Sequence, residues 1–106
     1  MKVTLEDIIS ELIVNGGDAR SKSLEAIRAA KHGDFKTAEE KIAAAEEALL
    51  NAHQFQTELI QAEISGESKV EISLIVIHAQ DHLMNAMTVK DLAVEILDIC
   101  RTFNKN

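Results

Sequence analysis

The stretch that decides the fold runs from Ile72 to Met87 and reads ISLIVIHAQDHLMNAM. Wound as a helix, it carries apolar side chains on nearly every side, without the wide polar stripe of a surface helix. Two partner helices cannot cover a helix of this kind, and further copies of the chain are the simplest cover. The stretch therefore predicts a helix that is buried within a homo-oligomer.

The rest of the chain also favours helix, because it lacks proline and is rich in alanine, leucine, glutamate and lysine. Thr4 and Asp7 have the spacing of a capping box, which predicts a first helix over residues 4–32. The sequence NGGD at residues 15–18 contains two adjacent glycines, which cost roughly 2 kcal/mol relative to alanine inside a helix. We therefore expect a kink or break at residues 15–18.

Two further helices follow. Asp34 predicts the start of a second helix over residues 34–64, whose apolar side chains recur every three or four positions. Ser68 and Glu71 form a second capping-box pattern and predict a third helix over residues 68–103. Short connections make consecutive helices antiparallel neighbours. The predicted fold class is all-α, an antiparallel three-helix bundle.

The length of 106 residues fits a single domain over residues 1–106. A net charge of −7 argues against broad nucleic-acid binding, which requires clustered Lys and Arg side chains. No apolar run approaches the roughly 20 residues that span a bilayer, so we expect no direct membrane insertion. Because Cys100 is the single cysteine, no internal disulfide is possible, and with no apolar leader at the N-terminus we expect a cytoplasmic protein.

The decisive stretch also contains a polar cluster. His78, Asp81 and His82 stand at positions i, i+3 and i+4, which places them on one side of a helix. Polar groups in an apolar segment are expensive unless they are paired or used, so this cluster is the candidate site. Two uses are open at this point. One histidine can act as a nucleophile, or all three side chains can serve as metal ligands in a helical metal-binding or adaptor protein.

Longer sequence motifs around this cluster resemble a known family. They are the string LIVIHAQDHLM at residues 74–84, followed by KDLA at residues 90–93, and the strings GDARS at residues 17–21 and AAKHGDF at residues 29–35. Together they resemble the lactose/cellobiose (chitobiose)-type IIA component of the bacterial phosphoenolpyruvate-dependent sugar phosphotransferase system. The resemblance covers essentially the whole chain.

The resemblance implies a fold, partners and roles for individual residues. It implies a three-helix subunit that assembles as a homotrimer around the third helix. It also implies that His78 accepts a phosphoryl group on Nε2 from the phosphocarrier HPr and passes it to a cysteine of the IIB component. The membrane permease IIC then imports the disaccharide as it is phosphorylated. Asp81 from each subunit is expected to hold a divalent cation, Mg²⁺, on the trimer axis.

Physical chemistry supports these implied roles. Imidazole has an ordinary pKa of about 6.5, so a neutral nucleophile is available near neutral pH. His82 lies one turn away and is expected to support the phosphoryl group by donating a hydrogen bond. Three Asp81 carboxylates about 4 Å apart would repel by roughly 4 kcal/mol per pair at an effective dielectric of about 20, which a cation relieves. The family resemblance implies a Thr or Ser directly after Leu83 and Met84, and Asn85 departs from it.

Asp18 and Arg20 follow the glycine pair and have two interpretations. Asp18 could cap the helix where it restarts after the expected kink, with Arg20 as a surface cation. Alternatively, both residues shape a wall of the site or a docking face.

Overall fold

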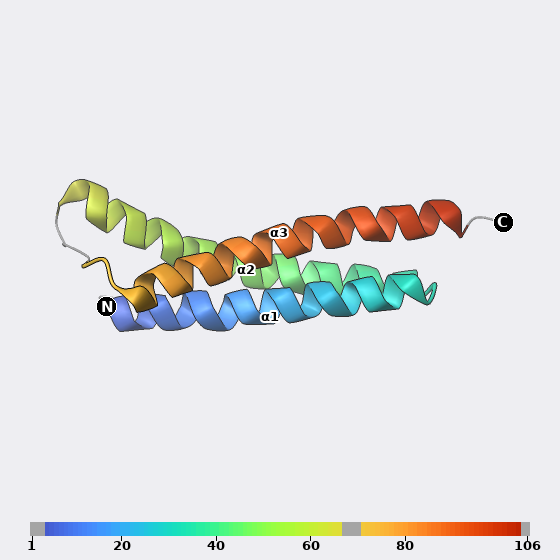
Figure 1. Ribbon diagram of the computed structural model, residues 1–106, viewed down its shortest axis with the longest axis horizontal. Helices are drawn as coiled ribbons and strands as arrows, with labels where there is room; N and C mark the ends of the chain where they lie inside the picture. Colours follow the sequence, from blue (N-terminus) through green and yellow to red (C-terminus); the bar gives the residue numbers. More distant parts are fainter. Residues whose placement is uncertain (1–3, 67–70, 105–106) are drawn as a thin grey trace.

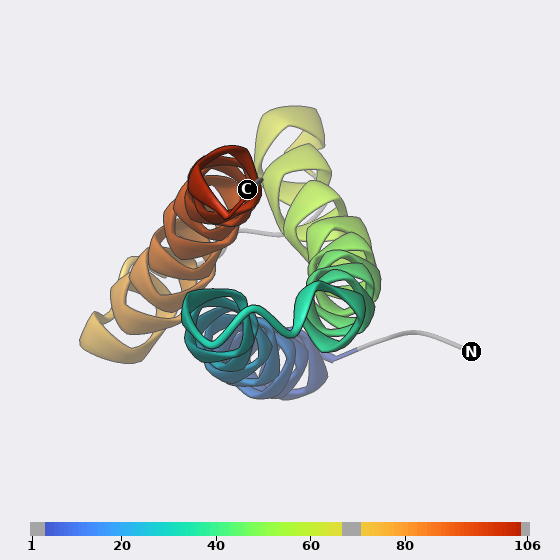
Figure 2. The ribbon, with the colours of Figure 1, turned by 90° about the vertical axis from the view of Figure 1, so that its right-hand side faces the viewer.

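The computed structural model describes residues 4–66 and 71–104. This part of the chain forms three α-helices in the order α1 (Leu5–Lys31), α2 (Phe35–Ser65) and α3 (Leu74–Phe103), as Figure 1 shows. Successive helices run in opposite directions, and seen end-on they occupy the corners of a triangle (Figure 2). The described residues contain no strand, so the all-α antiparallel bundle is confirmed. None of the described helices combines the length and apolar character needed to cross a membrane.

The first two helices begin where local sequence predicts. The Asp7 backbone N–H donates to the Thr4 hydroxyl at 3.1 Å, and the Thr4 N–H donates to the Asp7 carboxylate at 3.2 Å. This reciprocal pair completes the capping box of α1. At the start of α2 the Thr37 N–H donates to the Asp34 carboxylate at 3.2 Å. Hydrogen bonding from Thr37 holds the pKa of Asp34 below its ordinary value of 3.8.

The third helix begins later than the sequence predicts. Its N-cap is Ser73, whose hydroxyl accepts a hydrogen bond from the Val76 N–H at 3.3 Å. The predicted cap Ser68 lies outside the described residues, and residues 71–73 are not helical, so the predicted start at residue 68 is wrong. Ile72 is 82% exposed and contributes little packing that would hold an earlier turn. Ser73, directly before Leu74, therefore sets the start of α3.

The predicted kink at residues 15–18 is also wrong, because α1 continues through them without a break. Gly16 is buried against α3, and a Cβ added to it would lie 3.2 Å from the His82 ring. The unfavourable helix propensity of the two glycines is thus offset by close packing between helices. Since Asp18 lies inside α1 rather than at its start, its interpretation as an N-cap is wrong as well.

Small side chains line the contacts between the helices. The buried stripe of α1 from Gly16 onward consists of Ala19, Ser23, Ala26 and Ala30. Among the described residues, alanine supplies most of the buried apolar side chains. Those on α2 and α3 are Ala38, Ala45, Ala48, Ala52, Ala79, Ala86 and Ala93. Small residues let helix axes approach closely, so α1 lies tightly against both neighbours.

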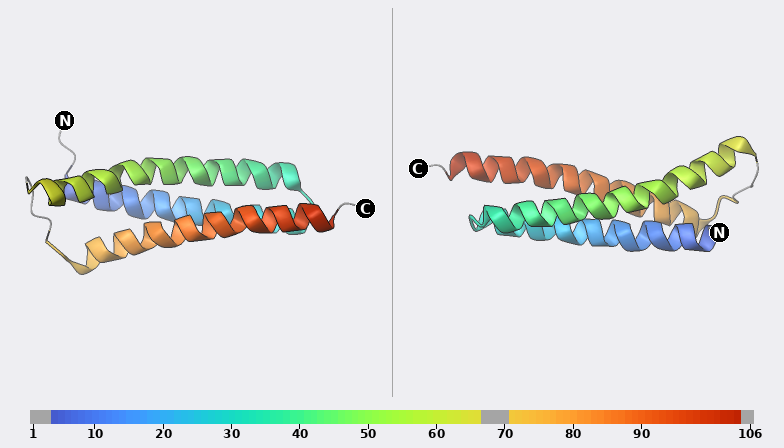
Figure 3. Two further views of the ribbon diagram at one scale, coloured as in Figure 1. Left: turned by 90° about the horizontal axis from the view of Figure 1, so that it is seen from above. Right: turned by 180° about the vertical axis from the view of Figure 1, so that it is seen from behind.

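The two helices that flank α1, α2 and α3, are joined near the end of α3 by an ion pair and a ring contact. Near the end of α3, Arg101 forms an ion pair with Glu39 of α2 and lies over the Phe35 ring at 5.7 Å from its centroid. The ribbons of α2 and α3 cross in Figure 1, and seen from above they separate toward the start of α3 (Figure 3, left). The candidate residues of α3 lie in this diverging half.

Candidate functional site

The two histidines of the candidate site lie one turn apart on α3 and stack on each other. Their ring centroids are 5.7 Å apart and the ring planes are inclined by 28°. His78, in the second turn of the helix, is exposed, whereas His82 is half-buried. The site thus presents one accessible imidazole that is backed by a second, partly enclosed one.

His82 is held by the glycine pair of α1. A Cβ on Gly16 would lie 3.2 Å from His82 Cδ2, and a Cβ on Gly17 would lie 3.2 Å from His82 Nε2. The absence of both Cβ atoms makes room for the imidazole on the surface of α1. The sequence interpretation missed this role of Gly16 and Gly17, although the unusual pair was the signal that something required glycine there.

Asp81 lies on a different stripe of α3 from His82. Successive residues of a helix are rotated by about 100°, which places Asp81 about 100° from His82 and about 60° from His78. Asp81 is exposed, and its carboxylate accepts a hydrogen bond from the Asn85 side-chain amide at 3.3 Å. Among residues 4–66 and 71–104, no three His, Cys, Asp or Glu side chains come together where they could hold a metal ion. The alternative of a metal site built from these three side chains of one chain therefore gains no support.

Asp81 belongs to the uncovered face of α3. The large apolar side chains on this face, which we call the apolar seam, are Leu74, Ile77, Met84, Leu92 and Ile99. Each lies within about 60° of Asp81 around the helix axis. Between 50% and 84% of each side chain is exposed. The seam is an exposed apolar stripe interrupted by Asp81, Thr88 and Glu95, and exposed apolar side chains gathered on one face mark an interaction surface.

A side-chain bridge connects the second turn of α3 to α2 on the flank opposite the histidines. The Gln56 amide donates to the Gln80 side-chain oxygen at 2.8 Å and approaches the Met84 sulfur at 3.8 Å. Gln80 therefore faces α2, not the histidines. His78 lies about 160° from Gln80 around the helix axis, so with Gln80 turned toward α2 the His78 side chain faces away from α2.

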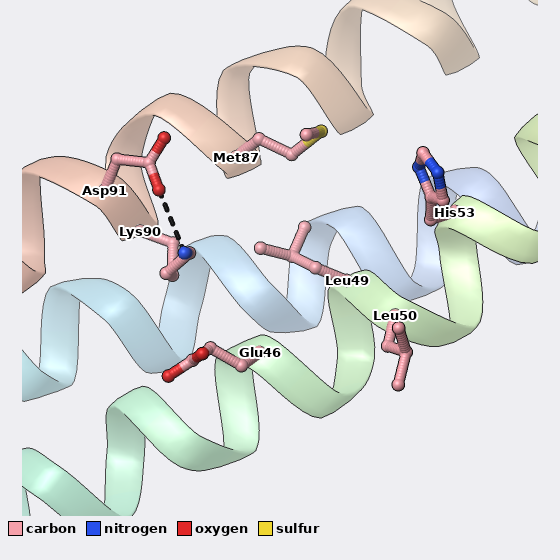
Figure 4. Close-up of a pocket in the computed structure, with 7 residues that line it drawn as sticks. All are labelled: Glu46, Leu49, Leu50, His53, Met87, Lys90 and Asp91. Atoms are coloured by element: carbon pink, nitrogen blue, oxygen red, sulfur yellow. Dashed lines mark ion pairs between the residues drawn. The ribbon is translucent and has the colours of Figure 1, made fainter.

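A pocket of about 300 Å³ lies between α2 and α3, away from the histidine pair. Figure 4 shows the residues that line it: Glu46, Leu49, Leu50, His53, Met87, Lys90 and Asp91. Lys90 and Asp91 form an ion pair at 2.9 Å. None of the residues predicted to carry the chemistry lines this pocket. The candidate site is consequently an exposed ring on a helix surface, not a cavity.

Comparison with known proteins identifies the family. Residues 7–101 match the family model described as the lactose/cellobiose-specific IIA subunit of the phosphotransferase system. The chain belongs to this family. Its members are phosphotransferase components, so the chain is a IIA component of a sugar phosphotransferase system.

Relatives with assigned names share most of the chain. The lichenan-specific phosphotransferase enzyme IIA component of Bacillus subtilis strain 168 is 54% identical over 99 residues, which cover 93% of this chain and 89% of the relative. The crystal structure of the cellobiose-specific enzyme IIA from Bacillus anthracis is 51% identical, with a TM-score of 0.91 over 100% of this chain and 97% of that one. Both likenesses extend over the three helices that hold the site.

One solved relative was determined together with a partner. The IIA component of the N,N'-diacetylchitobiose branch of the Escherichia coli phosphotransferase system was solved in solution as a complex with HPr. It is 37% identical to this IIA chain, with a TM-score of 0.82 over 97% of this chain and 99% of that one. The three-helix scaffold seen here is thus one on which HPr docks in a relative.

Proposed function

We propose that His78 is the phosphoryl acceptor of this IIA component. The observation that carries the proposal is the exposed His78 imidazole stacked on the anchored His82 ring. An incoming phosphoryl group needs an accessible nucleophile held in one orientation. His78 supplies the nucleophile, and its donor is phospho-HPr, in keeping with the HPr complex of the chitobiose relative.

The transfer consists of one bond exchanged for another. The bond between phosphorus and the donor breaks as a phosphorus–nitrogen bond forms on the neutral His78 ring. The phosphorylated His78 ring releases the proton of its other nitrogen to solvent. In the second transfer the thiolate of a IIB cysteine attacks phosphorus, the phosphorus–nitrogen bond breaks, and His78 takes up a proton and leaves as neutral imidazole. The IIB component then supplies the phosphoryl group for coupled uptake and phosphorylation of a disaccharide through the IIC permease. We place the IIA component in the cytoplasm, where both partners reach it.

His82 has a supporting role in this proposal. Its ring lies one turn from His78 and is confined between α3 and the glycine pair of α1. From that position an N–H of the imidazole can donate to an oxygen of the phosphoryl group on His78. A donor that is already in place stabilises the developing charge without reorganisation during the transfer.

The assembled form of this proposal is a homotrimer with α3 at its centre. The apolar seam of α3 supports it, because a single chain leaves these side chains uncovered. Around a threefold axis the three Asp81 carboxylates meet and together hold a Mg²⁺ ion, which prefers oxygen ligands. The exposed Asp81 carboxylate, hydrogen-bonded by Asn85 within the seam, fits this role. The cation supplies charge neutralisation between subunits, while the chemistry stays on His78.

The proposed acceptor is tested by labelling. The chain is incubated with phosphoenolpyruvate, enzyme I and HPr, and the product is analysed for an acid-labile, base-stable phosphate. Label is expected on the wild-type chain and on His53→Ala, which removes another exposed histidine on α2, and is expected to vanish in His78→Ala. Retention of the label in His78→Ala, or its loss in His53→Ala, contradicts the assignment. Mass spectrometry of the labelled peptide identifies the residue directly.

A further inference from the structure

Gly17 occupies a position that has no backbone need for glycine. It lies inside α1, and the glycines of the described chain with positive φ are Gly33 and Gly66. Alanine would favour the helix more at this point. The reason for glycine must therefore lie in what a side chain would touch.

A side chain at Gly17 would touch one atom. An added Cβ lies 3.2 Å from His82 Nε2 and has no other neighbour within 4 Å outside the local helix backbone. That separation is shorter than an ordinary carbon–nitrogen contact, so the ring would have to move away. The missing Cβ at Gly17 consequently fixes how far the His82 ring can lean onto α1.

Gly16 has a different surrounding, although it is the neighbouring residue. Its added Cβ would lie 3.2 Å from His82 Cδ2 and also 3.5 Å from the His82 backbone carbon and oxygen. The contacts at 3.5 Å are ordinary van der Waals contacts, so the side chain would touch the backbone of α3 and crowd only the ring. Gly16 thus lies against both the backbone and the ring of His82, whereas Gly17 lies against the ring alone.

The position of the His82 ring affects the orientation of His78, because the two rings stack on each other. His78 and His82 lie 5.7 Å apart between centroids, at an angle of 28°. Because the two rings stack, a His82 ring displaced from Gly17 changes its contact with the His78 ring. The absence of a Cβ at Gly17 therefore influences the orientation of His78. It also influences where His82 can donate a hydrogen bond.

We propose that Gly17 is a positioning residue for phosphoryl transfer: by lacking a Cβ it seats the His82 ring on α1, and through the stacked rings it orients His78. The inference rests on the proposed role of His78 as acceptor. It assigns a function to α1 in a reaction whose reacting groups lie on α3.

The test is a double-mutant cycle on the full chain. Transfer from phospho-HPr is measured by rapid quench for wild type, Gly17→Ala, His82→Ala and the double variant. A ring displaced by a few tenths of an ångström is expected to lower kcat by about three- to tenfold and to leave KM for HPr unchanged. In the His82→Ala background, where no ring remains to be displaced, Gly17→Ala is expected to have no further effect. An equal loss in both backgrounds, or no loss in either, overturns the proposal.

Two further measurements separate ring placement from general damage. The ring-current shifts of the His78 imidazole protons in NMR spectra are expected to change in Gly17→Ala and to stay unchanged in Lys31→Ala, an exposed change about four turns farther along α1. Thermal stability of Gly17→Ala is expected to equal or exceed that of wild type, because alanine favours helix. Unchanged His78 shifts in Gly17→Ala overturn the proposal even if transfer is slow. Failure of the wild-type chain to be labelled on His78 instead refutes the proposed function, while the NMR comparison still tests the contact.

Discussion

Replacing Leu92 with alanine tests the apolar seam of α3 as a subunit interface. Leu92 is 56% exposed in the single chain. Full burial of a leucine side chain contributes about 1.5–3 kcal/mol, so burial of the exposed half contributes about 1 kcal/mol per chain. A trimer loses this contribution three times, about 3 kcal/mol in all. That loss lowers the trimer association constant by roughly two powers of ten.

Sedimentation equilibrium over a range of protein concentrations measures this change directly. The trimer has three times the monomer mass of 11.7 kDa, so the two species are easily resolved. Val14→Ala is the matched control, because Val14 is 63% exposed and lies opposite the buried stripe of α1. Circular dichroism should show the same helix content for both variants. A wild-type chain that stays monomeric at every concentration, or equal association of the two variants, would refute the reasoning.

Three other substitutions have defined outcomes. Asp81→Leu removes carboxylates that would repel by roughly 4 kcal/mol per pair on a common axis at an effective dielectric of about 20. The trimer of this variant should therefore persist in EDTA. Monomers in a sedimentation experiment would contradict this expectation. Leu83→Ala truncates a fully buried side chain and should lower the free energy of unfolding by about 2–5 kcal/mol, measured in urea at fixed protein concentration. Asp34→Asn removes a carboxylate whose pKa is below 3.8 in the folded chain, so its stabilisation is present above pH 3.8 and lost as the pH falls through the folded pKa. Thermal melts should therefore show the variant less stable at neutral pH, with a difference that disappears in acid.

Helix starts that depend on neighbouring residues could be predicted from the sequence. Thr4 with Asp7, and Asp34 with Thr37, form their hydrogen bonds within one turn, so the pattern and the structure coincide. The start of α3 was predicted wrongly, because Ser68 and Glu71 have the spacing of a capping box, and the prediction was based on that pattern. The structure uses Ser73, whose third residue is Val76.

The effect of the glycine pair was predicted wrongly, because the glycines destabilise their own helix but pack against a residue of another helix. Helix propensity counts only the unfavourable backbone entropy of Gly16 and Gly17. Their benefit lies in the contact with His82, which is on another helix. No sequence pattern within α1 reports that contact, so the kink was predicted where the structure has a continuous helix.

The histidine pair could be predicted from spacing, but its surroundings could not. Positions i and i+4 of a helix are neighbours whatever the fold, which is why His78 and His82 stack as expected. Which way they face depends on how the bundle rotates α3, and that rotation is set by tertiary contacts such as the bridge between Gln56 and Gln80. The spacing therefore predicted that Asp81 and His82 share one side of α3, although they lie about 100° apart around the helix axis.

The alanine-lined contacts between the helices have a consequence for which substitutions the bundle tolerates. In many domains truncation of a large side chain is the main hazard, because it leaves a void. Here Ala79 and Ala86 of α3 are fully buried, and the buried residues of α1 are also mostly small: glycine, alanine and serine. A single added methyl group at such a position has no space to occupy and forces the backbones apart. At these positions an increase in side-chain size is therefore more harmful to the bundle than a loss of contacts.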